Sequence, residues 1–407
     1  MDETNETDKS REQTANEPKS AERLPDKLVA QRREVAEKVA RDMEELGSGW
    51  KIPWTQAGAP MNPATGTEYR GGNAVYLKAY AAIRGYGDYR WATYNQGKER
   101  GWKLKKGSKA VSVEHWRRVS FDRKDAQGNV ITGKDGEPER GSRVVLDGYW
   151  NVFNLSCFEG APELPPFEPN DDADFGLLAD ELKASCRCPV EETTSPDAFY
   201  SPVTDKVTVP RREQFESNAA FCGTLLHEMA HATAPELGRD VMNTFGTEAY
   251  AREELTAELA SLFASGELGV PVDPDARSEH YEQHVKYLAN WSKAIREDPD
   301  ALFRAAGAAG RAATYTVDRW EEATGKQAPG RAEAREARAA YETDRAEKER
   351  LGDKKTAVEK QMAGARSERA ERLKRSAEKK RQQQASTGPS RRGADPRDAG
   401  RSRGRSR

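Results

Sequence analysis

Residues 224–231 read TLLHEMAH, and this segment restricts the fold more than any other part of the chain. In a helix, residues four apart lie on the same face, so His227 and His231 would aim two imidazoles at one point. Glu228 would project from the adjacent edge, where it could act as a general base. This H-E-x-x-H arrangement binds zinc in metalloproteases and predicts a metal site on a helix.

The alternative is a pair of histidines that are satisfied inside an ordinary core. The predicted helix 213–233 is strongly apolar around the motif, with Phe221, Leu225, Leu226 and Met229 as its neighbours. Two imidazoles and a carboxylate buried in such surroundings would be costly without a partner. The motif also uses two of only five histidines in the chain. We therefore favour the metal site.

A third protein ligand is needed to complete the site. A metzincin would place Gly at 234 and His at 237, but these positions are Ala234 and Leu237, so that class is excluded. The segment EAYAREELTAELASLF (248–263) offers a carboxylate on a second helix, as in gluzincins. We assign Glu254 to the metal and Glu258 to an outer hydrogen bond with a ligating imidazole. Glu253 stays open as the alternative ligand, because the helix phase is uncertain by one residue.

The chemistry expected of this site is peptide hydrolysis. Zn²⁺ is the expected cofactor, with another divalent ion such as Mn²⁺ as the alternative. Glu228 would take a proton from the attacking water and return it to the leaving amine. The predicted strand at 205–210 lies just upstream and could present an edge to an extended peptide.

Composition divides the chain into a folded middle and two charged ends. Charged residues make up 33% of the chain and the hydrophobic set only 36%, which predicts a compact core with disordered termini. Helical spacing predicts helices over 26–46, 175–186, 213–233, 248–268, 278–297 and 300–320, with a short strand pair at 198–202 and 205–210. The boundaries we predict are a disordered 1–25, domains at 26–160 and 175–325, a Pro-rich acidic linker at 161–174 and a low-complexity tail at 326–407.

Neither a signal peptide nor a transmembrane helix is expected, since the first residues are polar and no run of about 18 apolar residues occurs. The four cysteines form no CxxC pair and are read as reduced thiols, so a cytoplasmic location is expected. From Arg331 onward there are 24 basic and 13 acidic residues. Such a tail either attracts polyanions or is simply a solvated end.

The first domain combines strands with exposed aromatic and basic character. Residues 109–121 and 142–155 read as two strands that flank a Gly- and Asp-rich hairpin loop at 122–141. Residues 50–116 hold five of the eight tryptophans, interleaved with cations that include Lys105 and Lys106. Rings that stack on bases and cations that follow phosphates are typical of single-stranded DNA binding. The alternative is an ordinary small core with a basic loop.

The segments NPATGTEYRGGN, GYGDYRWATYNQ, GWKLKKGSKAVSV and WNVFN run in the order of the N-terminal domain of ArdC-like antirestriction proteins, which TraC-type primases share. YSPVTDKVTVP, TLLHEMAH and YAREELTAELASLF resemble the zincin-like metallopeptidase domain that follows it in that family. The resemblance covers about residues 30–320. It implies an α+β fold, with a small single-stranded DNA-binding domain followed by a mainly helical, gluzincin-type metallopeptidase domain.

The resemblance also implies residue roles and a function. It carries His227, His231 and Glu254 over as metal ligands and Glu228 as the base. It points to a DNA-facing set of Tyr69, Arg70, Asn73, Arg90 and Trp91. The sequence departs from the family at ATAPELGRD (232–240), where Pro235 ends the helix sharply, which puts the wall of the substrate cleft in doubt.

The function implied is that of a zinc metallopeptidase that binds single-stranded DNA and protects incoming plasmid or phage DNA from restriction. The expected partners are single-stranded DNA and a protein substrate, for which a host restriction component is the candidate, and no membrane is expected. Two alternatives stay open. One is a non-catalytic DNA-coating protein whose metal is structural, and the other is a conjugation or primase accessory factor.

Overall fold

The computed structural model describes residues 24–46, 58–125, 127–164, 172–242, 247–271 and 291–386 of the 407-residue chain. Two compact units are present, residues 1–341 and residues 342–407. Residues 1–23 of the predicted disordered N-terminus, 165–171 of the predicted linker and 387–407 of the predicted tail lie outside the described residues. So does most of the predicted helix 278–297, of which 291–297 is helical. The predicted domain boundaries therefore stay predictions.

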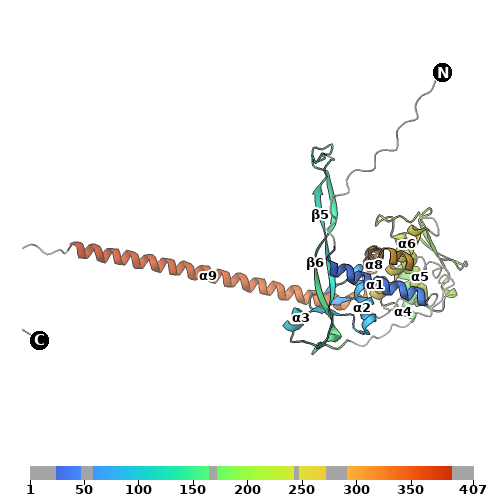
Figure 1. The fold of residues 1–407 in the computed structure, drawn as a ribbon, viewed down its shortest axis with the longest axis horizontal. Coiled ribbons are helices and arrows are strands. Elements are labelled where there is room, and N and C mark those ends of the chain that lie inside the picture. The colour runs from blue at the N-terminus through green and yellow to red at the C-terminus, as the bar shows by residue number, and fades with distance from the viewer. Residues whose placement is uncertain are drawn as a thin grey trace, which may run out of the picture. The chain divides into compact units, whose positions relative to one another are not determined.

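The first half of unit 1 is built from helices around a small antiparallel sheet (Figure 1). Its helices are α1 (Asp26–Leu46), α2 (Gly72–Arg84) and α3 (Tyr94–Glu99). The sheet has the order β3-β6-β5, from β3 (Trp91–Thr93), β5 (Val111–Asp122) and β6 (Arg140–Asn154). Two smaller pairs complete it: β1 (Met61–Asn62) with β2 (Thr67–Glu68), and β4 (Lys103–Leu104) with β7 (Phe158–Glu159).

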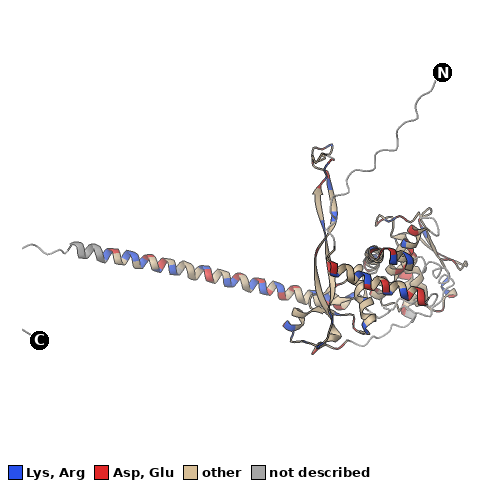
Figure 2. Cartoon of the chain, in the orientation of Figure 1, with Lys and Arg blue, Asp and Glu red and all other residues tan. Residues whose placement is uncertain are grey.

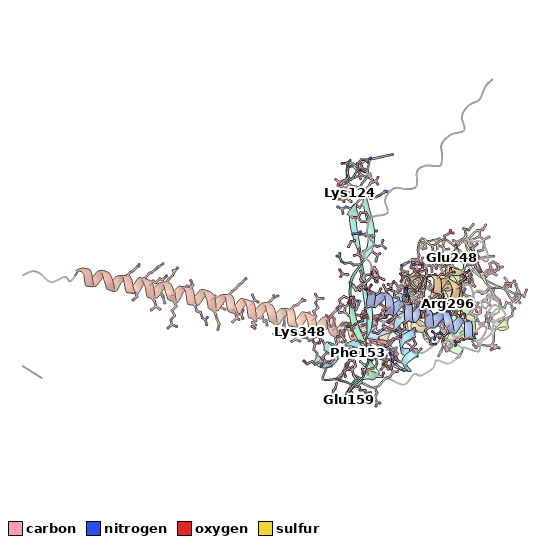
Figure 3. All side chains as sticks on the ribbon, in the orientation of Figure 1. Lys124, Phe153, Glu159, Glu248, Arg296 and Lys348 are labelled. Carbon is pink, nitrogen blue, oxygen red and sulfur yellow. The ribbon has the colours of Figure 1, made fainter. Side chains whose placement is uncertain are left out.

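The predicted hairpin is confirmed. Strands β5 and β6 pair antiparallel from Val111↔Val152 to Asp122↔Arg140, with one irregularity between His115 and Trp116. The pair extends well beyond the helices, with Lys124 near its tip and Phe153 near its base (Figures 1 and 3). The base is fixed to α2 because the Asn73 side chain exchanges two hydrogen bonds with the backbone of Glu114 (2.7 and 2.9 Å).

The second half of unit 1 is mainly helical. It contains α4 (Asp172–Ser185), α5 (Asn218–Ala232), α6 (Glu248–Leu268) and α8 (Asp300–Thr324). A three-stranded sheet of order β8-β10-β9 covers residues between α4 and α5: β8 (Val190–Thr193), β9 (Phe199–Ser201) and β10 (Lys206–Pro210). Buried residues from both halves belong to one continuous hydrophobic cluster.

The sheet corrects one prediction. Strand β10 is not an edge: β8 pairs parallel with it on one side, from Val207↔Val190, and β9 pairs antiparallel on the other, from Lys206↔Ser201. The sequence pattern missed β8, whose pairing joins segments far apart along the chain. An extended peptide would therefore have to add to β8 or β9.

Helix α9 (Ala332–Ser386) forms most of unit 2, so a large part of the predicted low-complexity tail is helical. Among the described residues, no helix has the length and apolar content needed to cross a membrane. All four cysteines are free thiols, as predicted.

Candidate metal centre

Helix α5 holds the HExxH motif inside the protein. Ser217 caps its N-terminus by accepting a hydrogen bond from the Ala220 N–H (3.1 Å). Its apolar side chains, Phe221, Leu225, Leu226 and Met229, are all buried. Burial of this face fixes the rotation of the helix, so that His227 and His231 both turn toward α6, against which α5 packs.

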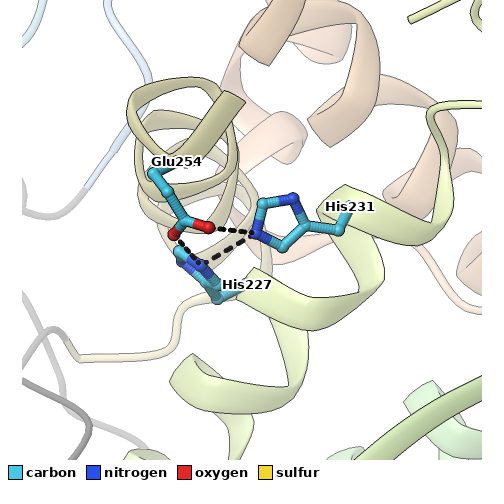
Figure 4. A group of neighbouring side chains, drawn as sticks. All are labelled: His227, His231 and Glu254. Carbon is cyan, nitrogen blue, oxygen red and sulfur yellow. Dashed lines mark hydrogen bonds and ion pairs between the residues drawn. The ribbon is translucent and has the colours of Figure 1, made fainter. Parts of the chain in front are cut away.

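Three donors converge between the two helices (Figure 4). The Nε2 atoms of His227 and His231 are 3.2 Å apart, and the Glu254 carboxylate lies 3.5 Å from the first and 3.6 Å from the second. The ligand atoms all lie within 4.8 Å of one another. His227 and Glu254 are buried, at 7% and 8% exposed. A single small ion placed among them could be reached by all three side chains.

Two further carboxylates of α6 fix the imidazoles from behind. Glu258 lies 3.3 Å from Nδ1 of His227, and Glu253 lies 3.1 Å from Nδ1 of His231. A carboxylate that accepts a hydrogen from Nδ1 leaves the lone pair of Nε2 directed inward, where the other imidazole and Glu254 lie. Two lone pairs and an ionised carboxylate that face one another require a cation, and this donor set fits a divalent metal ion.

The ionisation of these groups reflects the same concentration of negative charge. Burial alone would lower the pKa of His227, but hydrogen bonds with Glu254 and Glu258 raise it well above its ordinary value. For His231 burial again opposes the charge, yet Glu253 and Glu254 raise the pKa to about 9. Burial disfavours ionised Glu254, while the two imidazoles hold its pKa far below the usual range. Positive charge is thus strongly favoured at this point of the interior.

Arg239 extends the network on the side of His231. Its guanidinium lies 3.0 Å from a Glu253 oxygen and donates to Thr233 Oγ1 (2.9 Å) and to the carbonyl of Ala230 on α5. Its side chain is only 9% exposed, and burial lowers its pKa. The turn that follows α5 brings it back, with Gly238 in the left-handed region at φ 67°.

Arg239 is the main residue that sequence reasoning missed. The only signal was its place in ATAPELGRD, the segment that departs from the family. The structure brings His227, His231 and Glu254 together and places Glu253 at Nδ1 of His231. Of the two candidate third ligands, Glu254 is therefore the one that faces both Nε2 atoms. Glu228 is buried, at 3% exposed, beside His227.

Two predicted DNA-facing residues, Arg90 and Trp91, lie in the interior. Arg90 is 3% exposed, with its guanidinium held by Asp88 (2.8 Å) and the carbonyl of Pro162 (2.9 Å). Trp91 is 1% exposed and packs against the rings of Tyr80 and Tyr86. Burial argues against direct contact with DNA, since neither ring nor guanidinium faces solvent. Sequence alone could not distinguish the cases, because Trp and Arg serve both purposes.

The other predicted contacts divide into scaffold and surface. Tyr69 is buried and its hydroxyl accepts a hydrogen bond from Asn62, and Asn73 is occupied by the Glu114 backbone. Arg70 is exposed and pairs with Glu68 at 2.7 Å. Lys105 and Lys106 are exposed as well, and Lys105 donates to the carbonyl of Ser156. Only these last three cations offer groups to a nucleic acid, and their role stays a prediction.

Comparison with known proteins accounts for both halves of the fold. Residues 30–153 match the family described as the N-terminal domain of anti-restriction factor ArdC, and residues 178–308 match zincin-like metallopeptidases. The uncharacterized protein y4eC of Sinorhizobium fredii is 32% identical over 289 residues, which cover 69% of this chain and 89% of that protein. The chain belongs to the ArdC-like family. The predicted α+β domain followed by a mainly helical zincin-like domain is confirmed.

Two DNA primases TraC of Escherichia coli are also similar to this ArdC-like protein. One is 34% identical over 296 residues (70% of this chain) and the other 33% identical over 289 residues (67% of this chain). The chain spans only 19% and 26% of their respective lengths. Similarity to the primases is therefore confined to a small part of each.

Two crystal structures of the antirestriction protein ArdC from plasmid R388 resemble this ArdC-like protein at 27% sequence identity. The metal-free structure has a TM-score of 0.53 and covers 72% of this chain and 98% of its own. The Mn(II)-bound structure has a TM-score of 0.52 and covers 71% and 97%. Together with the convergent donors, the zincin-like fold indicates a divalent-metal site.

Proposed function

We propose that this ArdC-like protein is a metal-dependent peptidase that also binds single-stranded DNA, and that it protects incoming plasmid or phage DNA from restriction in the cytoplasm. The observation that carries the proposal is the convergence of His227, His231 and Glu254, with a carboxylate behind each imidazole that fixes its orientation. The donor set favours Zn²⁺, and Mn²⁺ is the alternative that the R388 ArdC structure supports.

The proposed reaction assigns a task to each side chain. When bound, a divalent cation would polarise the scissile carbonyl and acidify a water molecule. Glu258 and Glu253 hold the two imidazoles in the tautomer that presents Nε2 to the centre. Glu228 takes the proton of the attacking water as the new C–O bond forms at the carbonyl carbon. It then passes this proton to the amine nitrogen, so that the peptide C–N bond breaks and the amine leaves.

DNA binding is assigned to the first half of the protein. Its support is the match to the ArdC N-terminal domain, together with the exposed cations Arg70, Lys105 and Lys106. Primase activity is not proposed, since the chain spans only 19% of one TraC primase and 26% of the other.

Glu228→Gln tests whether catalysis is needed. Gln keeps the shape of the side chain and leaves the three ligands intact, but it cannot accept the proton. We expect protection of transforming plasmid DNA in a restricting host to be lost, since a general base contributes about 10²- to 10⁴-fold to a rate. The exposed Glu216→Gln serves as the matched control and should protect like the wild type.

Metal content and single-stranded DNA affinity of the purified variants complete the test. If Glu228→Gln loses protection but still binds the metal and single-stranded DNA, the result supports a peptidase function. Full protection by Glu228→Gln would overturn it in favour of DNA coating with a structural metal. If the wild type itself gives no protection, the antirestriction role falls.

A further inference from the structure

Helix α9 carries an uneven distribution of charge along its length (Figure 2). Residues 332–353 hold 5 basic and 7 acidic residues, whereas residues 354–386 hold 11 basic and 4 acidic residues. At 1.5 Å of rise per residue, the distal part is a cationic rod about 50 Å long. Every side chain described from 342 onward is exposed, so this charge faces solvent.

The cations of the two parts differ in how they are used. In the proximal part, Arg345 pairs with Glu349 (2.9 Å) and Lys348 with Asp344 (2.7 Å). Such pairs four residues apart stabilise an exposed helix. In the distal part, among the side chains that the structure describes, only Arg375 has an ion pair within the helix, with Glu371 at 3.7 Å. The other distal cations whose side chains the structure describes are therefore left to act on a partner.

One face of the distal part is predominantly basic. At 3.6 residues per turn, five of the cations whose side chains the structure describes, and one acid, Glu359, lie within about 80° of the direction of Met362. These five, called the basic face below, are Lys354, Lys355, Arg366, Arg369 and Arg372. The opposite side mixes Lys360, Lys374, Arg375 and Lys379 with the remaining acids Glu368, Glu371 and Glu378.

The residues between these cations narrow the choice of partner. Leu351, Val358, Met362 and Leu373 share the basic face, but they are too few and too widely spaced for an amphipathic membrane helix. Lys355 and Arg369 interrupt the same line and would repel their counterparts in a coiled coil. No Trp, Phe or Tyr occurs after Tyr341, so the helix has no ring on which unpaired bases could stack.

We propose that the basic face of α9 binds the phosphate backbone of double-stranded nucleic acid without reading its sequence. A straight helix fits the width of the major groove, and the basic face spans about 27 Å, along which a duplex carries a charge every 1.7 Å or so. This contact is separate from the single-stranded DNA binding assigned to the first half of the protein, and it does not depend on the metal centre.

The test replaces all five residues of the basic face by Gln in the full-length protein. Gln is a good helix former, so the helix should persist, and far-ultraviolet circular dichroism checks this. The matched control replaces Lys360, Lys374, Arg375 and Lys379 by Gln. Affinity for a 40-base-pair duplex of arbitrary sequence is measured by fluorescence anisotropy at several salt concentrations.

The wild type should show a steep fall of affinity with salt. Each lost phosphate contact flattens the slope of log affinity against log salt concentration by about 0.9, so the loss of five contacts should make the slope of the basic-face variant less steep by about 4.5. The slope of the control should change by clearly less. Affinity for an oligothymidine single strand should change much less in both variants. Equal slopes for the basic-face variant and the control would overturn the proposal. So would wild-type binding to phosphatidylserine vesicles but not to duplex, or binding to neither.

Discussion

Arg239 should determine how tightly the centre holds its metal, although it lies outside the ligand set. In Arg239→Gln the buried Glu253 carboxylate, 10% exposed, loses the guanidinium 3.0 Å away. Among the described residues, it keeps the Nδ1 of His231 as its hydrogen-bond partner. An uncompensated carboxylate would pull the imidazole from its inward orientation. Loss of an outer partner of this kind typically weakens metal binding about 10- to 100-fold, equal to about 1.4–2.7 kcal/mol.

The assay is a competition between the protein and a chromophoric chelator, which gives Kd for Zn²⁺ and for Mn²⁺ without any need for activity. Arg187→Gln is the matched control. The Arg187 Nε donates to the carbonyl of Ala232 (2.6 Å), so this variant also removes a cationic group from the C-terminal end of α5, but Arg187 has no recorded contact with Glu253. We expect its Kd to stay within about threefold of the wild type, while both variants unfold at a lower temperature.

A double variant tests whether Arg239 affects metal binding through the charge of the Glu253 carboxylate. Adding Glu253→Gln to Arg239→Gln removes the unpaired carboxylate, and directly contacting residues commonly show coupling of about 0.5–3 kcal/mol. The two changes should therefore cost less together than their sum. The contrary result would be an Arg239→Gln variant that binds both metals as tightly as the wild type and unfolds at the same temperature as Arg187→Gln. Arg239 would then only cap helix α5, and it would have no effect on metal affinity.

Three further outcomes are expected. Chelation of the metal should lower the unfolding temperature, because an ion at 100 times its Kd stabilises the fold by about 2.7 kcal/mol; a calorimetric midpoint unaffected by chelator would contradict a site formed only in the folded state. Asn73→Ala should cost about 1–3 kcal/mol in urea unfolding, because both backbone groups of Glu114 lose their partner, while single-stranded DNA affinity of the folded fraction stays the same; a selective loss of affinity would restore its DNA-facing role. Gly223→Ala on α5 should stabilise the fold by up to about 1 kcal/mol, since nothing lies within 4 Å of the added carbon. Gly330→Ala should destabilise the fold, because the added carbon would lie 2.4 Å from the carbonyl oxygen of Gly266. Thermal melts that give Gly330→Ala the higher unfolding temperature would contradict both.

Local signals in the sequence predicted the helices best. The predicted ranges 26–46 and 248–268 coincide with α1 and α6, because both segments are bounded by clear signals in the sequence. At α6 these are the Thr247 cap and the left-handed Gly269. The strand order was not predictable in the same way. The parallel pairing of β8 with β10 depends on residues distant in sequence, and it turned a predicted edge into the centre of a sheet.

Helical spacing also brought His227, His231 and Glu254 to one point, but it could not decide what Glu253 does. A single residue of phase separates the two glutamates, and only the packed pair of helices shows that one faces the centre and the other lies behind His231. The aromatic and basic motif of the first domain was harder still. The same Arg90 and Trp91 that would suit DNA are buried by neighbours that no local pattern reveals.

The centre depends on the register of α5 against α6 more than on any single ligand. Glu253, Glu254 and Glu258 all come from α6, and each meets an imidazole of α5. A slide of α6 along α5 would change the distances between all three carboxylates and the imidazoles at once. The Ser261 hydroxyl, about one turn after Glu258 on α6, donates to the carbonyl of Gly223, one turn before His227 on α5 (2.9 Å). This hydrogen bond holds the register of the two helices. The contacts between the two imidazoles and the three carboxylates therefore form or break together. Arg239 contacts both Glu253 and the C-terminal end of α5, and for this reason it affects the whole site.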